Sequence, residues 1–410
     1  MARLRTCFLS SLTFLSTAAA LAQSVPTTLS GQVNRDRIPI PAVPFLTFTP
    51  DARSAALGDA GVALSPDANA LYWNSARLPF AEKHSGLAAS YTPWLSNLGI
   101  SDMYLGYVSG YKKIANDQII GLSVNYFDLG QIEFTNDVGV SLGTFFSREY
   151  AISGSYARKL SDRIGVGVNL RYINSNLVGN QVINNVAAKP GTSVAGDIAF
   201  FYNDDNAERR WNVNYGAVLS NIGGKVSYGG TNSYHLPTNL KLGTALTRRF
   251  SEDHRLTFAL DLNKLMVPTP PEYRQVNGAP ARDPNGNFII ERGRDPYTQS
   301  ALGGAFGSFA DAPNGFNEEL QELTASFGAE YWFKNAFALR AGYFFENPNK
   351  GNRQYITTGL GVNYNNLGLD FAYLFQGGGE INPLNNTLRL TLSLKFDKRT
   401  RPALLDDEED

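Results

Sequence analysis

The most regular feature of the chain is an alternation of apolar and polar residues with a period of two. In the segment 387–397 the apolar positions are Leu388, Leu390, Leu392, Leu394 and Phe396. The positions between them are polar and include the cations Arg389 and Lys395. Because successive side chains of a strand point to opposite faces, this segment predicts a strand with one wholly apolar face. Its length is enough for a tilted strand to cross the hydrocarbon core of a membrane.

Fourteen segments show this pattern, and together they predict an all-β, 14-stranded antiparallel transmembrane barrel. They are 84–92, 102–112, 117–134, 145–159, 163–177, 193–203, 210–220, 238–250, 254–264, 322–334, 336–346, 353–365, 367–376 and 386–397. The connections after even-numbered segments are short and those after odd-numbered segments are mostly longer, as periplasmic turns and extracellular loops are. We therefore expect an outer-membrane β-barrel over residues 84–397, with both termini in the periplasm. A soluble β-sandwich is the alternative, but it gives no reason for this alternation in length.

The first residues predict export. Arg3 and Arg5 form a positive start, residues 8–21 are apolar, and residues 20–22 form a small-x-small cleavage site. A signal peptide over residues 1–22 is therefore expected. An N-terminal membrane anchor is the alternative, for which about 14 apolar residues are too few. No later segment offers about 18 continuous apolar residues, so no membrane-spanning helix is expected.

Composition narrows the class of protein further. Charged residues make up 18% of the chain, against about 25% in ordinary soluble domains, and aromatic residues make up 12%. The 36 Lys and Arg against 37 Asp and Glu exclude a generally basic nucleic-acid-binding protein. Cys7 is the single cysteine and there are three His, which argues against a zinc or disulfide scaffold. The mean hydropathy of −0.22 argues against a bundle of membrane helices.

Three regions lie outside the predicted strands. Residues 23–83 form an N-terminal extension, which beyond Asp51 is apolar enough to fold into the lumen as a plug from the periplasmic side. Residues 265–321 form the longest predicted extracellular loop, with helical stretches at 300–309 and 317–323, and loops of this length are commonly functional. Residues 398–410 end in a run of Asp and Glu, which predicts a solvated acidic periplasmic tail.

Charges on the predicted inner face of the strands have mixed sign. They are the cations Arg171, Lys241, Arg340, Arg389 and Lys395 and the anions Asp197, Asp261, Glu330 and Asp370. An Arg or Lys facing lipid at mid-depth would cost about 2–4 kcal/mol, which supports placing these residues inside. The mixture predicts internal ion pairs that hold the plug, rather than an ion-selective pore.

The sequence contains no recognisable catalytic motif. G-x-S-x-G, the P-loop, H-E-x-x-H and C-x-x-C are all missing. We therefore expect no enzyme activity, no cofactor and no metal site. One nucleophile–base pair lies close together in a predicted loop, Ser233 and His235, and it leaves a rim hydrolase as a weak alternative.

Two stretches resemble known outer-membrane barrels. Residues 52–61 (ARSAALGDAG) and 71–76 (LYWNSA) resemble the hatch region of FadL-like barrels, with Ser75 in place of the proline of a common Asn-Pro-Ala element. Residues 306–321 (FGSFADAPNGFNEELQ) resemble the corresponding loop of the PorV family, also called LptO, of the type IX secretion system. The resemblance extends over nearly the whole chain after the expected signal peptide. It assigns a plug motif to Arg53, Leu57, Gly58, Asn74 and Ala76.

The resemblance implies a FadL-like barrel that acts by binding proteins. Members of the family receive cargo that carries a C-terminal secretion domain from the large translocon Sov, also called SprA. They deliver it to an attachment complex that contains PorU, PorQ and PorZ. These proteins and outer-membrane lipid are the expected partners, and nucleic acid is not. Many such barrels end on a terminal aromatic as their insertion signal, whereas this chain continues for 14 residues beyond Phe396.

Aromatic residues of the predicted loops are the expected contacts for cargo or translocon, because aromatic rings dominate protein-binding hot spots. They are Trp94, Tyr228, Tyr234, Phe306, Phe309 and Phe316. Two alternatives stay open. A FadL-type transporter of hydrophobic small molecules would need an apolar pocket beside the plug and a lateral opening, for which the strand around Gly359 and Gly361 is the candidate. A lipid A deacylase would need a rim pair such as Ser233 and His235.

Overall fold

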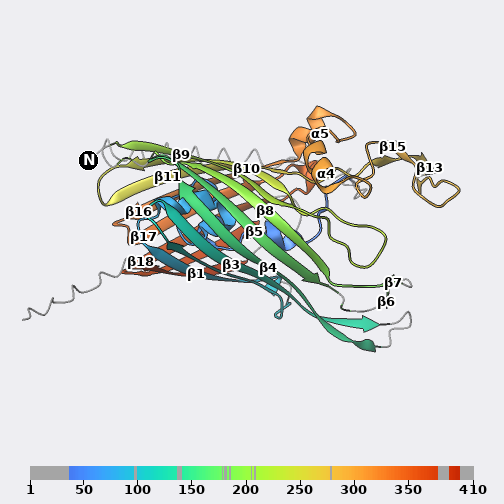
Figure 1. The fold of residues 1–410 in the computed structure, drawn as a ribbon, viewed down its shortest axis with the longest axis horizontal. Helices are drawn as coiled ribbons and strands as arrows, with labels where there is room; N and C mark the ends of the chain where they lie inside the picture. The colour runs from blue at the N-terminus through green and yellow to red at the C-terminus, as the bar shows by residue number, and fades with distance from the viewer. Residues whose placement is uncertain are drawn as a thin grey trace, which may run out of the picture.

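A single closed barrel makes up most of the structure. The computed structural model describes residues 37–397, apart from 97–98, 136–140, 178, 180–181, 184–185, 205, 207–208, 278 and 377–386. The expected signal peptide 1–22, the start of the extension at 23–36 and the acidic tail 398–410 lie outside the described residues. In the described part, fourteen antiparallel strands each pair with their neighbours in sequence, and β1 closes the barrel by pairing with β20 (Figure 1). The predicted fold class is confirmed.

Each of the fourteen predicted segments overlaps one barrel strand, with bounds that agree to within four residues. The barrel strands are β1 (Ser85–Pro93), β2 (Tyr104–Lys113), β3 (Gln118–Thr135), β4 (Ser141–Lys159), β5 (Ile164–Asn176), β8 (Gly191–Tyr202), β9 (Trp211–Gly223), β10 (Asn239–Arg249), β11 (His254–Leu265), β16 (Leu323–Phe333), β17 (Phe337–Phe345), β18 (Gln354–Tyr364), β19 (Leu367–Gln376) and β20 (Leu388–Phe396). The clearest difference is that β4 begins four residues before the predicted start at 145. A register shift between Asp128 and Gln131, at Gly130 with φ of 76°, lets β3 and β4 continue pairing as a long hairpin.

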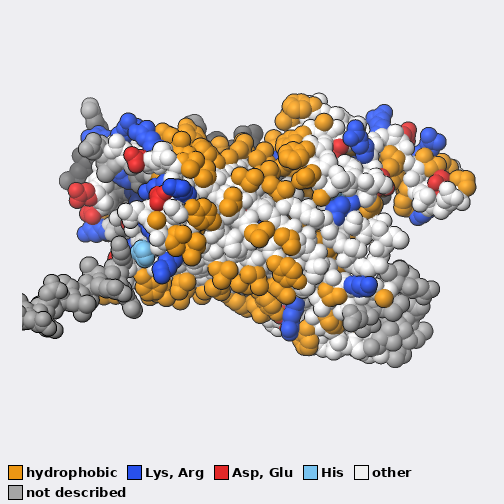
Figure 2. Space-filling model, in the orientation of Figure 1, with side chains coloured by type: hydrophobic (Ala, Val, Ile, Leu, Met, Phe, Trp, Pro, Cys, Tyr) orange, Lys and Arg blue, Asp and Glu red, His pale blue; other side chains and the backbone are white. Residues whose placement is uncertain are grey.

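The outer surface of the barrel is apolar along its flank. Outward residues such as Leu87, Leu170, Ile198, Leu339 and Leu360 are each at least half exposed. Figure 2 shows hydrophobic side chains over the flank and most charged side chains toward the two ends of the barrel. This distribution is that of a barrel whose strands cross a lipid bilayer. Within the described ranges, no helix has the length and apolar character needed to cross a membrane.

Short and long connections lie at opposite ends of the barrel. We call the end with the connections 114–117, 160–163, 203–210, 250–253, 334–336 and 365–366 the turn end, and the opposite end the loop end. The longest connection, 266–322, contains two helices and two small sheets. They are α4 (Ala301–Gly307) and α5 (Phe316–Gln321), with β12 (Glu272–Tyr273) paired to β15 (Ile290–Arg292) and β13 (Gln275–Val276) paired to β14 (Ala279–Pro280). Both helices fall within the predicted helical stretches to within a residue or two, whereas the small sheets were not predicted. Three further elements lie in the other long connections: the paired strands β6 (Val182–Ile183) and β7 (Val186–Ala187), and the helix η4 (Pro348–Lys350).

The segment before β1 fills the inside of the barrel, where it is drawn in blue in Figure 1. Its elements are η1 (Pro44–Thr47), α2 (Ala52–Ala55), α3 (Ala70–Trp73) and η2 (Ser75–Phe80). We call residues 44–80 the plug. Its apolar residues form buried clusters with inward-facing wall residues, and Leu71 belongs to one such cluster with Ile119 and Ala157. A water-filled lumen would leave these small apolar side chains exposed to water, and the packing buries them.

Inward-facing glycines of the wall make room for the plug. The backbone of Gly342 lies so close to the plug that an added Cβ atom would be 2.1 Å from the Gly58 nitrogen. Gly58 itself has φ of 66°, a conformation that side chains with a Cβ rarely adopt. The contact therefore requires glycine on both sides.

Candidate functional site

The plug is fixed to the wall by a buried cluster of charges. Arg53 of α2 donates two hydrogen bonds to Glu330 of β16, from Nε (2.9 Å) and from Nη2 (2.8 Å). Its Nη1 donates to Asp67 of the plug at 2.7 Å. Arg340 of β17 donates to the same Glu330 at 2.8 Å and to Asp370 of β19 at 2.7 Å. Glu330 thus bridges one plug cation and one wall cation, and we call this cluster the plug lock.

Further hydrogen bonds tie the plug backbone to other strands. Asp261 of β11 accepts from the backbone nitrogens of Gly61 and Val62, at 2.6 and 2.9 Å. Thr357 of β18 accepts from the Gly58 nitrogen at 2.9 Å. The predicted ion pairs between plug and wall are therefore present, and buried side chains from several strands hold the plug.

The remaining residues of the expected plug motif also lie at contacts with the wall. The Asn74 side-chain amide donates to the carbonyl of Phe200 on β8 at 2.9 Å, and its oxygen accepts from the Ala76 nitrogen at 3.1 Å. The Ala76 carbonyl lies against Gly165, where an added Cβ would come within 2.4 Å. Leu57 is fully buried against Gly328. Each of these motif residues therefore lies at the interface between plug and wall.

A cavity of about 300 Å³ remains between the plug and the loop end. Its wall includes the rings of Phe48 and Phe344, several prolines and Lys241. The Lys241 ammonium lies over the rings of Tyr72 and Trp73, at 5.0 and 4.8 Å from their centroids. The volume is at the lower end of the range for small-molecule sites.

The strand proposed for a lateral opening is continuous. Gly359 pairs with Arg340 on one side and with Ala372 on the other, and Gly361 pairs with Ala338 and Asp370. Ala56 of the plug lies where a side chain at Gly359 would project. The expected gap at Gly359 and Gly361 is therefore wrong, because these glycines accommodate the plug and Arg340 rather than interrupting the wall.

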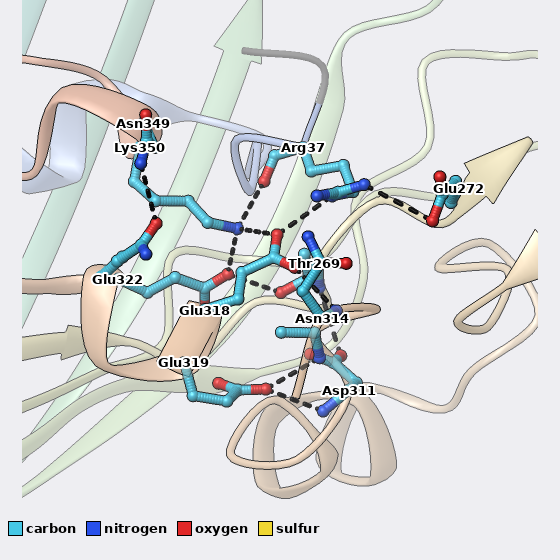
Figure 3. Close-up of polar contacts among 12 residues, drawn as sticks. Arg37, Thr269, Glu272, Asp311, Asn314, Glu318, Glu319, Glu322, Asn349 and Lys350 are labelled. Atoms are coloured by element: carbon cyan, nitrogen blue, oxygen red, sulfur yellow. Dashed lines mark hydrogen bonds and ion pairs between the residues drawn. The ribbon is translucent and has the colours of Figure 1, made fainter. Parts of the chain in front are cut away.

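At the loop end, α5 turns its charges toward the barrel. Glu318 and Glu319 of the helix and Glu322 after it are each 6% exposed. Glu318 accepts from Arg37 at 3.0 Å and from Lys350 at 2.8 Å. Figure 3 shows these side chains converging from α5, from the 347–352 connection and from the start of the described chain. We call this cluster the clasp.

The other two carboxylates complete the clasp. Glu319 accepts from Lys264 at 2.8 Å and from the backbone nitrogens of Asp311 and Ala312. Glu322 accepts from Lys350 at 2.7 Å, from the Thr269 hydroxyl at 2.8 Å and from Lys264. Three anions and three cations, Lys264, Lys350 and Arg37, thus fasten the long connection to the barrel rim. Sequence analysis predicted the helical stretch but not the role of its carboxylates, because the three cations that pair with them lie far from it in the chain.

Asp311 is a buried titratable group beside the clasp. Burial raises the pKa of Asp311 to about 6, and the charges of Glu319 and Glu322 add to the rise, against hydrogen bonds from Thr269. Burial also acts to raise the pKa of Glu318, but Lys350, the Asn314 backbone nitrogen and Arg37 outweigh it and hold that pKa below its usual value. The stabilising contribution of Asp311 therefore decreases as pH rises, whereas that of Glu318 increases.

We expect Asp311→Asn to keep the connection attached above pH 6. A carboxyl with a raised pKa stabilises the attached state fully below its free pKa of 3.8, and this contribution is lost as pH rises through about 6. An amide at this position does not ionise. Limited proteolysis of the connection, normalised to an unstructured peptide at each pH, should accelerate between about pH 4 and pH 7 in the native chain and stay nearly constant in the variant. Equal pH profiles would show that Asp311 does not carry this dependence.

Four of the six expected contact rings are exposed. They are Tyr234, Phe306, Phe309 and Phe316, with exposed fractions of 37%, 59%, 45% and 73%. Leu302, Tyr297 and Leu320 of the same connection are also exposed and were not singled out from the sequence. The loop end therefore carries a set of apolar side chains that nothing in the described part of the chain covers.

Trp94 and Tyr228 do not belong to this exposed set. Trp94 is 8% exposed and stacks on Phe48 of the segment before α2, with ring centroids 4.5 Å apart. Tyr228 is half-buried, with its hydroxyl 2.9 Å from the Ser175 hydroxyl. The expectation of an exposed ring is wrong for Trp94, because the N-terminal segment covers it, and holds only in part for Tyr228.

The other sequence candidates occupy plain structural positions. His235 is buried, and its Nε2 donates to the Pro296 carbonyl at 3.0 Å, so this ring nitrogen is engaged with the backbone rather than with Ser233. Phe396 ends β20 on the outer face and is 41% exposed. Among the described residues, no group of three or more His, Cys, Asp or Glu is arranged to hold a metal ion.

Comparison with known proteins gives one family match and several similar folds. The family model described as "Type IX secretion system protein PorV" matches residues 31–272, more than half of the chain. The Pseudomonas putida toluene transporter TodX is 14% identical, with 84% of this chain and 96% of that chain covered and a TM-score of 0.47. The Ralstonia pickettii toluene transporter TbuX is 11% identical (84% and 98% covered, TM-score 0.46), and a Pseudomonas aeruginosa FadL homologue is 13% identical (88% and 100% covered, TM-score 0.44). None of the curated proteins compared with the chain matches it.

Proposed function

The chain belongs to the PorV family of type IX secretion system proteins, and from this premise we propose that it is a non-enzymatic carrier of secreted proteins. It receives cargo bearing a C-terminal secretion domain from the translocon Sov (SprA). It then passes the cargo to the attachment complex with PorU, PorQ and PorZ. The loop end faces the cell exterior and the turn end faces the periplasm, since long loops of such barrels are extracellular. β20 ends at the turn end, as the expected periplasmic C-terminus requires, whereas the described chain starts at Arg37 in the clasp and so does not enter the lumen from the periplasmic side as expected.

One observation carries this proposal: the plug fills the lumen, whereas the loop end carries a long, structured connection with helices and small sheets. Buried side chains of several strands hold the plug, and the Glu330 bridge alone involves two guanidinium groups. A filled lumen favours binding at the rim over passage through the barrel. The clasp supports the same interpretation, because it holds a 57-residue connection in a defined shape between β11 and β16.

The exposed rings Tyr234, Phe306 and Phe309 form the proposed contact set for cargo or translocon. We expect Phe306→Ala combined with Phe309→Ala to lower capture of these partners about tenfold or more, because buried aromatic anchors contribute 1–2 kcal/mol or more each. A pulldown of the tagged protein in mild detergent, followed by mass spectrometry, measures the effect. Tyr364→Ala is the control, since this ring is at least as exposed as the two phenylalanines but lies at the turn end. Undiminished capture by the double variant would remove these rings as anchors.

The cavity beside the plug favours a second candidate, a FadL-type transporter of hydrophobic small molecules. Its lining combines aromatic rings and prolines with two lysines, Lys241 and Lys350. Lys241, which lies over two rings, suits the carboxylate of an amphipathic acid with a short apolar tail. Mass spectrometry of lipid extracted from the purified barrel tests this. A co-purified fatty acid that is lost in Lys241→Met supports transport, and an extract free of acyl ligand opposes it.

A further inference from the structure

We propose that the outward face of α5 is a lipid-contacting surface, which anchors the long connection in the bilayer leaflet at the loop end. This inference is independent of the cargo proposal. The surface consists of Phe316, Leu320 and Leu323, which we call the α5 row. Their exposed fractions are 73%, 49% and 36%.

The α5 row is continuous with the lipid-facing side of the barrel. Its members are spaced by four and three residues, so the first two lie on one face of the helix. Leu323 is the first residue of β16 and pairs with Lys264 of β11. Alternation along β16 places Phe327, which is 48% exposed, on the same outward face as Leu323.

Lys264 shows on which side of the wall α5 lies. Leu262, two residues before it, is 43% exposed on the outer face, and alternation places Lys264 on that same face. Lys264 is nevertheless 4% exposed, because Glu319 and Glu322 cover it. Glu319 therefore meets the outer side of the rim, whereas Glu322 and Lys350 also line the cavity inside it, so α5 lies across the rim. Figure 1 shows α5 at the loop end, beside the flank of the barrel. A lysine facing lipid is unfavourable, and the helix neutralises it there.

The charges of α5 are arranged as contact with lipid requires. A short amphipathic helix beside water ordinarily turns its carboxylates outward and its apolar residues inward. Here the orientation is reversed, and all six carboxylate oxygens of Glu318, Glu319 and Glu322 accept hydrogen bonds on the inner side. The outward face retains apolar side chains and the neutral Asn317. Such a face fits the boundary between headgroups and acyl chains better than it fits bulk water.

Site-directed spin labelling of the full chain in nanodiscs of palmitoyl-oleoyl phosphatidylcholine tests the proposal. Cys7, the only native cysteine, lies in the expected signal peptide and is replaced by Ser, so each introduced cysteine is unique. The test positions are Leu320→Cys and Phe316→Cys. Leu262→Cys is the control for the lipid-facing wall, and Asn285→Cys is the water-facing control, because Asn285 is exposed on a polar turn of the same connection.

We expect the labels at 320 and 316 to behave like the label at 262. At these positions the ratio of relaxation by oxygen to relaxation by the water-soluble nickel complex Ni-EDDA should be several-fold higher than at 285. Strong relaxation by Ni-EDDA at both test positions, as at 285, would overturn the proposal. Protection from both reagents would also overturn it, because it would indicate contact with a second copy of the chain rather than with lipid. An unchanged proteolytic pattern of the connection confirms that each labelled variant keeps the clasp.

Discussion

Replacing Glu330 with alanine should loosen the plug and raise the ion conductance of the barrel. The substitution removes the carboxylate that Arg53 and Arg340 share, and it leaves two guanidinium groups buried without their main anion. Breaking a buried ion pair from one side costs about 3–5 kcal/mol, which would shift a closed plug toward open states by at least about 100-fold. Single-channel recording in planar bilayers measures this directly, as frequent openings that the native protein lacks.

Asp197→Asn is the matched control for this experiment. Asp197 is also buried and pairs with an arginine, Arg171, at 3.0 Å, but both residues belong to the wall and neither bonds to the plug. We expect this variant to conduct like the native protein. If Glu330→Ala stays as silent as the control, the plug is held by its backbone hydrogen bonds and packing instead of by the plug lock.

Lys350→Met should release the long connection from the rim. Lys350 lies between Glu318 and Glu322, at 2.8 and 2.7 Å, and also donates to the Arg37 carbonyl. Without it, three buried carboxylates face two cations, and one uncompensated buried charge costs about 3–5 kcal/mol. Because nicking follows the population of the open form, cleavage by trypsin at the exposed arginines of the connection should accelerate by about 100-fold or more.

Two further variants make the clasp experiment decisive. Lys334→Met removes an exposed lysine at the turn end and should leave the cleavage rate unchanged. Lys350→Met combined with Glu318→Gln restores the charge balance and should recover much of the protection. A Lys350→Met connection that resists trypsin as well as the native one would show that the clasp does not hold it.

The barrel was predictable from the sequence because its signal is local. The two faces of a strand can be recognised from about ten consecutive residues, by their alternation of apolar and polar side chains. The lengths of the connections then indicate at which end of the barrel each connection lies. The positions of Glu330, Asp261 and Arg340 on the inner face followed from the same period. Their partners did not follow, since which plug residue meets which strand depends on how the closed barrel seats the plug.

The sites that sequence reasoning missed all depend on contacts distant in the chain. The clasp joins Arg37 to Glu318, 281 residues apart, and no periodicity connects them. The same reason explains Trp94, which would be exposed in an isolated loop but is covered by Phe48. An acidic run such as Glu318–Glu319 usually lies in water, and only the cations of the rim reveal that this one faces inward.

The contacts between the plug and β20 bear on the order in which the protein is assembled. The Thr391 hydroxyl of β20 accepts from the Ala52 nitrogen at 2.8 Å, and Arg389 donates to the Thr49 carbonyl at 2.7 Å. These partners are 339 and 340 residues apart, and β20 is also the strand that closes the seam with β1. Contacts of such sequence separation form late, after the intervening chain is ordered. The plug, which is synthesised before the barrel strands, therefore completes its contacts only when β20, the last strand, is in place. Closure of the barrel between β1 and β20 is thus coupled to correct placement of the plug in the lumen.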